Sequence, residues 1–231
     1  MNTQSIILDT ETNTLYGLPV QIAYLPCSFE QGGFALEVNS VFDELFSVDQ
    51  PIGCGAMAVH HIIEADLIGK PSYKTFQMPV DTAYVIAHNV QYDLDVLKHC
   101  DIDVSKYKPI CTLALARMVF PAAPAHTVGA LSYMLSADQG QTRELLKEAH
   151  NAKADILLTA DILKHLVHSL GVRSMEELYQ ASEKARIPTH LNFGKHKGLA
   201  IGDVPASYVS WLLSQDELDP YLRKALLGQK G

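Results

Sequence analysis

The feature that most constrains this chain is a short apolar run that ends in two carboxylates. Ile6, Ile7 and Leu8 are followed by Asp9, and Glu11 comes two residues later. Alternate side chains of a strand point to the same face, so both carboxylates leave the strand on one side. They repel each other unless a cation lies between them. The pattern therefore predicts a site for a hard divalent ion, which prefers oxygen ligands.

Two later segments carry residues that could join this site. Asp93 is expected in the first turn of a helix, where the helix dipole favours an anion, and taken singly this is ordinary helix-start chemistry. His150 and Asp155 are five positions apart, and on one continuous helix they would diverge by about 140°. They can converge only if His150 precedes the helix and Asp155 lies in its first turns. That arrangement would place a mobile general base beside a metal ligand.

The expected elements alternate along the chain. Strands are expected at residues 5–8, 20–25, 34–46, 83–87 and 109–111. Helices are expected at residues 56–61, 90–100, 112–119, 128–135, 152–170 and 175–185. Strands followed by alternating strands and helices indicate a mixed α/β sheet with helices on its faces.

A domain boundary is expected at Pro188, which follows a complete helix. Residues 1–187 hold 13 Lys and Arg against 22 Asp and Glu, whereas residues 188–231 hold 5 against 4. We therefore expect a main domain at 1–187 and a small module at 188–231.

The small module is expected to contain a β-hairpin followed by helices. Its turn, at residues 194–198, contains Lys195, His196 and Lys197, and a phosphate-binding turn and a solvated turn are equally compatible with it. Tyr208 and Trp211 are interpreted as core residues of the module.

Composition excludes several classes of protein. The net charge of −8 argues against a passive nucleic-acid binder, although metal ions could neutralise an acidic active centre. Neither a signal-peptide pattern nor an apolar run long enough for a membrane span is present. The four cysteines lack CxxC spacing and a paired pattern, which is typical of a reducing compartment. A cytoplasmic protein that does not bind membranes is expected.

In combination, the three acidic segments resemble the DEDDh group of the RNase T-like 3′–5′ exonucleases. The likeness covers about residues 5–170 and rests on Asp9-Thr10-Glu11, on His88-Asn89 with Asp93, and on His150 with Asp155. Residues 56–65, 193–198 and 208–212 are similar to the bacterial exonuclease X branch of this family. The resemblance implies a ribonuclease H-like α/β fold, with a five-stranded mixed sheet flanked by helices and an exonuclease X-like C-terminal module.

The resemblance also implies an activity. It implies hydrolysis of DNA from the 3′ end by two Mg²⁺ or Mn²⁺ ions, with release of nucleoside 5′-monophosphates. The metal ligands would be Asp9, Glu11, Asp93 and Asp155, with Asp9 shared by both ions. His150 would be the general base, since an imidazole of ordinary pKa, about 6.5, suits this role near neutral pH. The residues expected to contact the terminal nucleotide are Thr10, Leu15 and His60.

Alternatives within the same chemistry are an exoribonuclease and a polymerase proofreading subunit. A non-catalytic nucleic-acid-binding protein is a third reading, and the intact set of five catalytic residues weighs against it. The expected partners are 3′ ends of single-stranded or duplex DNA, with RNA as the alternative, in DNA repair or end trimming. Homodimerisation is common among relatives and compatible with the resemblance.

Three departures from the family pattern bear on substrate preference rather than on the ligands. Asn13-Thr14 stands where the family usually has Thr-Gly. Gln21 stands where glutamate is common, and Tyr92 stands where phenylalanine is frequent.

Overall fold

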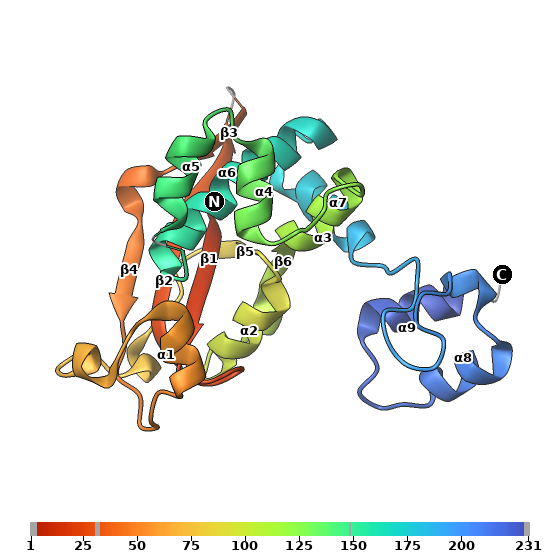
Figure 1. The fold of residues 1–231 in the computed structure, drawn as a ribbon, viewed down its shortest axis with the longest axis horizontal. Coiled ribbons are helices and arrows are strands. Elements are labelled where there is room, and N and C mark those ends of the chain that lie inside the picture. Colours follow the sequence, from red (N-terminus) through yellow and green to blue (C-terminus); the bar gives the residue numbers. More distant parts are fainter. Residues whose placement is uncertain (1–3, 31–32, 148, 229–231) are drawn as a thin grey trace. The chain divides into compact units, whose positions relative to one another are not determined.

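The computed structural model describes residues 4–30, 33–147 and 149–228. The chain divides into two compact units, Met1–Ser182 and Glu183–Gly231 (Figure 1). This division falls slightly before the boundary expected at Pro188, because the end of the preceding helix contacts the C-terminal helix. The hydroxyl of Tyr221 donates to Glu183 Oε1 at 2.6 Å, and the guanidinium of Arg186 lies 4.0 Å from the centre of the Tyr221 ring.

The first unit is built on a mixed sheet with β1 (Gln4–Thr12) in its middle (Figure 1). β1 is antiparallel to β2 (Pro19–Glu30) and parallel to β5 (Thr82–Ala87). β6 (Lys108–Cys111) continues the sheet, parallel to β5. The α/β mixed sheet expected from the sequence is confirmed.

The outer edge of β2 pairs with two short strands rather than one. β3 (Gly33–Leu36) pairs with the C-terminal part of β2, and β4 (Phe42–Leu45) pairs with its N-terminal part. The strand expected at residues 34–46 is interrupted by a 3-10 turn at Val38–Ser40. The described sheet therefore has six strands, because β3 and β4 together replace the single strand expected at residues 34–46.

Helices lie around this sheet, some on its faces and others packed on those helices. They are α1 (Cys54–His60), α2 (Val90–Lys98), α3 (Thr112–Val119), α4 (Val128–Leu135), α5 (Gln139–Leu146), α6 (Ala152–Leu170) and α7 (Met175–Ala185). α6 packs across β1 and β2, and α2 packs on β1, β5 and β6. α5 was not expected from the sequence, although Asp138 marks its start by accepting hydrogen bonds from the backbone N–H groups of Gly140 and Gln141. Among the described helices, none is both long and apolar enough to cross a membrane.

Burial of apolar side chains on both faces positions β1. Ile6, Ile7 and Leu8 are almost completely inaccessible to solvent, as are Ile86 of β5 and Ile156 of α6. A strand with helices on both faces is expected to be apolar at consecutive positions. The same strand then continues into Asp9 and Glu11, so the buried run fixes where these two carboxylates lie.

The second unit has its own hydrophobic core. It contains α8 (Ala206–Leu213) and α9 (Pro220–Leu227), packed around Leu191, Ile201, Val204, Val209, Leu212, Leu222 and Leu226. The hairpin expected before α8 is reduced to one antiparallel bridge between His190 and Ala200, flanked by backbone hydrogen bonds from Leu191 N to Leu199 O and from Ile201 N to Thr189 O. Trp211, expected in the core, is instead 51% exposed.

A buried hydroxyl at the edge of the sheet supplies a stability test. Ser182 Oγ accepts a hydrogen bond from Cys111 N, at the end of β6, at 2.8 Å, and both residues are buried. The substitution Ser182→Ala would leave this N–H without its partner and should lower the free energy of unfolding by about 1–3 kcal/mol. Urea denaturation followed by circular dichroism measures this change. Ser169→Ala, at an exposed position of α6, is the control and should change stability by no more than about 0.5 kcal/mol. Equal stability of both variants would contradict a stabilising role of the hydrogen bond between Ser182 and Cys111.

Candidate active site

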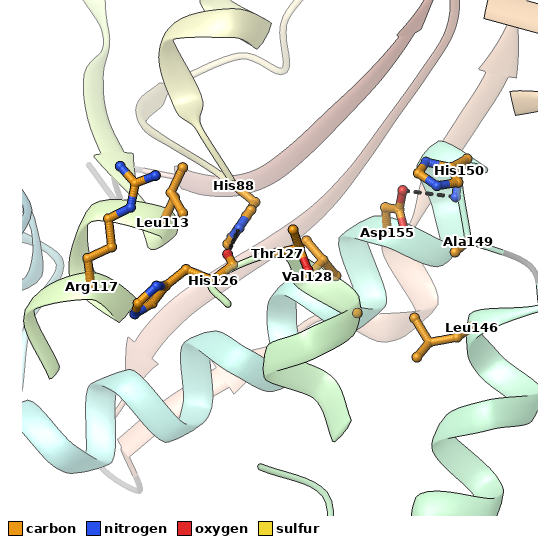
Figure 2. Close-up of a pocket in the computed structure, with 11 residues that line it drawn as sticks. His88, Leu113, Arg117, His126, Thr127, Val128, Leu146, Ala149, His150 and Asp155 are labelled. Carbon is orange, nitrogen blue, oxygen red and sulfur yellow. Dashed lines mark hydrogen bonds between the residues drawn. The ribbon is translucent and has the colours of Figure 1, made fainter. Parts of the chain in front are cut away.

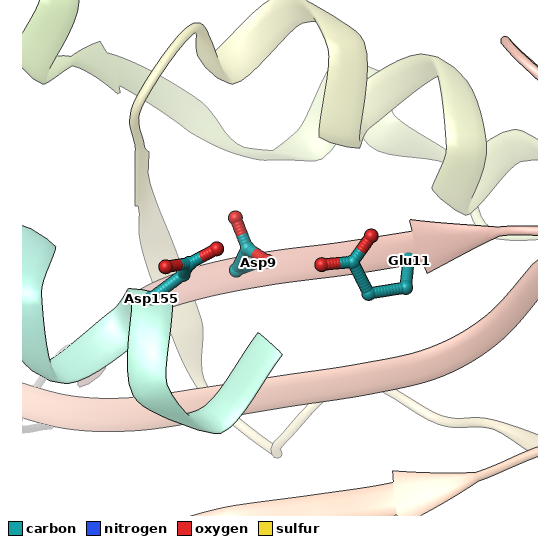
Figure 3. Close-up of side chains that lie close together, drawn as sticks. All are labelled: Asp9, Glu11 and Asp155. Atoms are coloured by element: carbon teal, nitrogen blue, oxygen red, sulfur yellow. The ribbon is translucent and has the colours of Figure 1, made fainter. Parts of the chain in front are cut away.

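Three carboxylates from two elements meet at the end of β1. Asp9 and Glu11 extend from one face of the strand, opposite Ala23 and Gln21 of β2. One oxygen atom from each of Asp9, Glu11 and Asp155 lies within 4.8 Å of the others. Figure 3 shows Asp155 reaching the two β1 residues from the beginning of α6. Three oxygen ligands at this separation suit a hard divalent cation.

The start of α6 decides how His150 and Asp155 lie. Asn151 is the N-cap of the helix, and its side chain accepts a hydrogen bond from Ala154 N. Asp155 therefore lies in the first turn, and His150 precedes the helix in a left-handed conformation with φ of 63°. The backbone N–H of His150 donates to Asp155 Oδ2 at 3.2 Å (Figure 2). This is the arrangement in which the two side chains can converge.

Asp93 lies next to this group but has a different partner. It is buried in the first turn of α2, and its Oδ1 accepts a hydrogen bond from Thr10 Oγ1 at 2.9 Å. Thr10 lies between Asp9 and Glu11 on the strand, so its side chain points to the other face. The hydrogen bond from Thr10 thus fixes the side chain of Asp93. Asp93 is not one of the three carboxylates that lie within 4.8 Å of one another. The side chain of Thr10 is itself buried.

Burial opposes ionisation of all four acids, and repulsion from neighbouring acids adds to this effect at Asp9 and Glu11. Burial raises the pKa of Asp9 well above its usual range, and the charges of Asp93, Glu11 and Asp155 raise it further. Burial, with the charges of Asp155 and Asp93, raises the pKa of Glu11 to about 8. Burial raises the pKa of Asp93 to about 7 despite the hydrogen bond from Thr10, and it also raises the pKa of Asp155. A bound divalent cation would compensate this electrostatic cost.

Gln21 joins the elements that carry the carboxylates. It lies opposite Glu11 on β2 and is buried. Its Nε2 donates to Asp43 Oδ1 at 2.7 Å, and its Oε1 accepts a hydrogen bond from Ala152 N at 3.2 Å. Gln21 therefore holds the first turn of α6, which contains Asp155, against β2. From the sequence this role was missed, although the pairing of Gln21 with Glu11 follows from strand register.

The end of β1 is held by two further side chains. Thr12 Oγ1 hydrogen-bonds with Tyr92 Oη at 2.8 Å, and the carbonyl oxygen of Thr12 lies 3.1 Å from His60 Nε2. His60 Nδ1 accepts a hydrogen bond from Ile62 N, which assigns the ring proton to Nε2. Burial lowers the pKa of His60. His60 is thus buried with both ring nitrogens bonded to the backbone, whereas Leu15, just beyond the strand, is 79% exposed.

A cavity of about 680 Å³ opens beside His150 and Asp155 (Figure 2). Its other lining residues are His88, Leu113, Arg117, His126, Thr127, Val128, Gly129, Leu146 and Ala149. The ring of His88 hydrogen-bonds with Thr112 Oγ1 at 3.0 Å and with the carbonyl oxygen of His126 at 2.8 Å. His88 therefore fixes one wall of the cavity. The volume lies in the range of small-molecule sites.

A central strand that ends in clustered carboxylates, with a histidine beside them, is typical of metal-dependent nucleases. The family model RNase_T, described as exonuclease, matches residues 6–163. The chain belongs to this exonuclease family, which confirms the relationship inferred from the three acidic segments.

Individual relatives agree with this assignment. Exodeoxyribonuclease 10 of Escherichia coli K12 is 28% identical over 225 residues, which cover 95% of this chain and 96% of that protein. A DNA polymerase III subunit epsilon-like protein of Rhodobacter capsulatus is 30% identical over 145 residues, covering 59% of this chain and 20% of that protein.

Solved structures show the same fold. Exonuclease X in complex with 5′ overhanging duplex DNA has a TM-score of 0.57 at 26% identity, covering 77% of this chain and 99% of that chain. Escherichia coli exonuclease I in complex with a dA16 oligonucleotide also has a TM-score of 0.57, at 15% identity, covering 81% of this chain and 44% of that chain.

The raised pKa values predict how the metal-free protein responds to pH. Folding raises the pKa of Glu11 to about 8 and of Asp93 to about 7, so the folded state binds more protons than the unfolded state above about pH 4. The free energy of unfolding of the protein in EDTA should therefore fall as the pH rises from about 4.5 to about 8. Urea denaturation at a series of pH values measures this slope.

Two comparisons complete this test. Mn²⁺ should raise the melting temperature more at about pH 8 than at about pH 5, because the ligands must be ionised to bind it. The variant Glu11→Gln, which lacks one titrating carboxylate, should show a shallower fall of stability with pH. Identical slopes for the variant and the wild-type protein would refute the electrostatic account.

Proposed function

We propose that this protein is a 3′–5′ exodeoxyribonuclease that releases nucleoside 5′-monophosphates from DNA. The observation that carries the proposal is the convergence of Asp9, Glu11 and Asp155 to within 4.8 Å, next to His150. The relative that matches 95% of the chain is named an exodeoxyribonuclease, and the solved neighbour with 26% identity holds duplex DNA. Both findings support DNA as the substrate.

The proposed metal ligands are Asp9, Glu11, Asp93 and Asp155, and the proposed ions are two Mg²⁺ or Mn²⁺. The ligand set fits such ions because it contains only carboxylate oxygens, and burial together with the neighbouring acids raises the pKa values of Asp9 and Glu11. Bound ions supply a water molecule of lowered pKa and stabilise negative charge on the phosphodiester. Thr10 orients Asp93, and Gln21 orients the helix that carries Asp155.

His150 is proposed as the general base. Its backbone is held by Asp155 while its side chain is exposed in the turn before α6. The imidazole takes a proton from the attacking water as the oxygen of that water forms a bond to phosphorus. The bond from phosphorus to the 3′ oxygen of the preceding nucleotide breaks, and that oxygen receives a proton from solvent. The product keeps its 5′ phosphate.

Among the residues expected to contact the terminal nucleotide, Leu15 is proposed for a direct apolar contact because its side chain is exposed. Thr10 and His60 are proposed to act indirectly. Their side-chain polar atoms already bond to Asp93 and to the backbone of Thr12 and Ile62. Thr10 would position the carboxylate of Asp93, and His60 would position the end of β1, next to which the terminal nucleotide would bind.

Digestion of a 5′-labelled DNA oligonucleotide tests this function. With Mg²⁺ the strand should shorten progressively from its 3′ end, and EDTA should stop the reaction. Asp9→Ala and Asp155→Ala should each abolish cleavage, because the metal ligands are lost. Asp161→Ala, at an exposed acidic position of the same helix as Asp155, is the control and should retain activity. Near-normal turnover by Asp9→Ala, or faster cleavage of RNA of equal sequence, would refute the proposal.

Loss of the imidazole should slow the chemical step without removing the metal ligands. His150→Ala should lower kcat by about 10²–10⁴-fold, the usual contribution of a general base, with little change in KM. Steady-state kinetics across pH measures both constants. His168→Ala, at an exposed position near the end of α6, is the matched control. A variant of His150 with unchanged kcat would assign proton transfer to another group.

A further inference from the structure

The second unit exposes its tryptophan, which is the only tryptophan of the chain. On α8, Val209 and Leu212 face the core of the unit, whereas Trp211 is 51% exposed. Phe193 and Leu199 of the preceding loop are 43% and 39% exposed. Large apolar side chains usually contribute to folding by being buried, so the exposure of several of them on one small unit favours an interaction surface.

The exposed indole continues a row of rings. The His196 ring meets the Tyr208 ring edge to face, with centroids 4.7 Å apart. The Tyr208 ring lies next to the Trp211 ring, with centroids 5.1 Å apart and planes inclined by 32°. The row links the loop at Gly194–Gly198, here called the basic loop, to α8.

The basic loop is fixed against α8 by a close backbone approach. Gly194 has φ of +71°, and a β-carbon at this position would overlap with the hydroxyl of Tyr208. Only glycine fits such a position without strain. The approach holds Lys195 and Lys197 near the ring row. Both lysines are exposed, and in the part of the chain that the structure describes neither makes an ion pair.

Charge separates the two units. Residues 183–231 hold 7 Lys and Arg against 5 Asp and Glu, a balance of +2, whereas residues 1–182 hold 11 against 21, a balance of −10. The sum is the net charge of −8. The second unit therefore has the net positive charge that favours binding of a polyanion.

We propose that the second unit contains a binding site for single-stranded DNA, with a base stacked on Trp211 and phosphates held by Lys195 and Lys197. An exposed aromatic ring beside free cations is the combination that binds single strands without sequence preference. The family match ends at residue 163, so this site lies outside the matched exonuclease segment. The choice of DNA over RNA rests on the proposed function, whereas the site itself requires no hydrolysis.

The fluorescence of Trp211 can report binding at this site directly, because the chain has no other tryptophan. Full-length protein with the substitution Asp9→Ala, kept in EDTA so that the strand stays intact, is titrated with oligo-dT of about ten nucleotides. Indole fluorescence should be quenched in a saturable manner. Trp211→Ala in the same background should weaken binding of a labelled oligo-dT by about fivefold or more, measured by anisotropy.

The lysines are tested by salt dependence. The double substitution Lys195→Gln and Lys197→Gln should reduce the slope of log affinity against log salt by about 1.4, the value for two phosphate contacts on a single strand. Lys224→Gln, at an exposed position of α9 in the same unit, is the control and should leave the slope unchanged. Circular dichroism shows whether each variant retains its helices.

Two outcomes would overturn this site. The first is unchanged indole fluorescence while labelled oligo-dT binds, which would confine the strand to the first unit. The second is equal quenching by duplex DNA of the same length, in which the bases are already stacked on one another. Because the titration involves no cleavage, its result stands apart from the digestion assay. Quenching by a strand that the wild-type protein does not cut would support this site and refute the proposed activity.

Discussion

Repulsion among buried carboxylates is the constraint on which the active site depends. Burial raises the pKa values of Asp9, Glu11, Asp93 and Asp155, and the charges of neighbouring acids raise those of Asp9 and Glu11 further. The fold holds them together because the buried apolar part of β1 and the packing of α6 on β1 and β2 are fixed independently of these charges. Apolar packing thus supports an arrangement that is electrostatically unfavourable until cations bind.

Neutral polar side chains surround the charged ones and decide where they lie. Thr10 donates to Asp93, and Gln21 fastens α6 to β2 and β4. Tyr92 and His60 hold Thr12 at the end of β1. Gln21 and Tyr92, two of these four residues, were expected from the sequence to depart from the usual family pattern, and both make specific hydrogen bonds here. Both side chains therefore support the elements that carry the carboxylates.

The two units differ in what their side chains can do with a nucleic acid. The first unit is strongly acidic. Its cluster of carboxylates repels a phosphodiester unless cations neutralise the negative charge. The second combines exposed lysines with the exposed ring of Trp211. Contacts through stacking and phosphates need no metal ion and tolerate any base sequence. Catalysis and retention of a strand would then rest on different chemistry within one chain.

From the sequence alone, the family, the mixed α/β sheet and the positions of Asp9 and Glu11 on one strand could be predicted, because strand periodicity and short motifs are encoded within a few neighbouring residues. Tertiary structure alone decided that Thr10 holds Asp93, 83 residues away, and that Gln21 holds the start of α6, 131 residues away. It also decided that Trp211 faces solvent. Such contacts depend on how distant segments pack, and local sequence patterns do not carry that information.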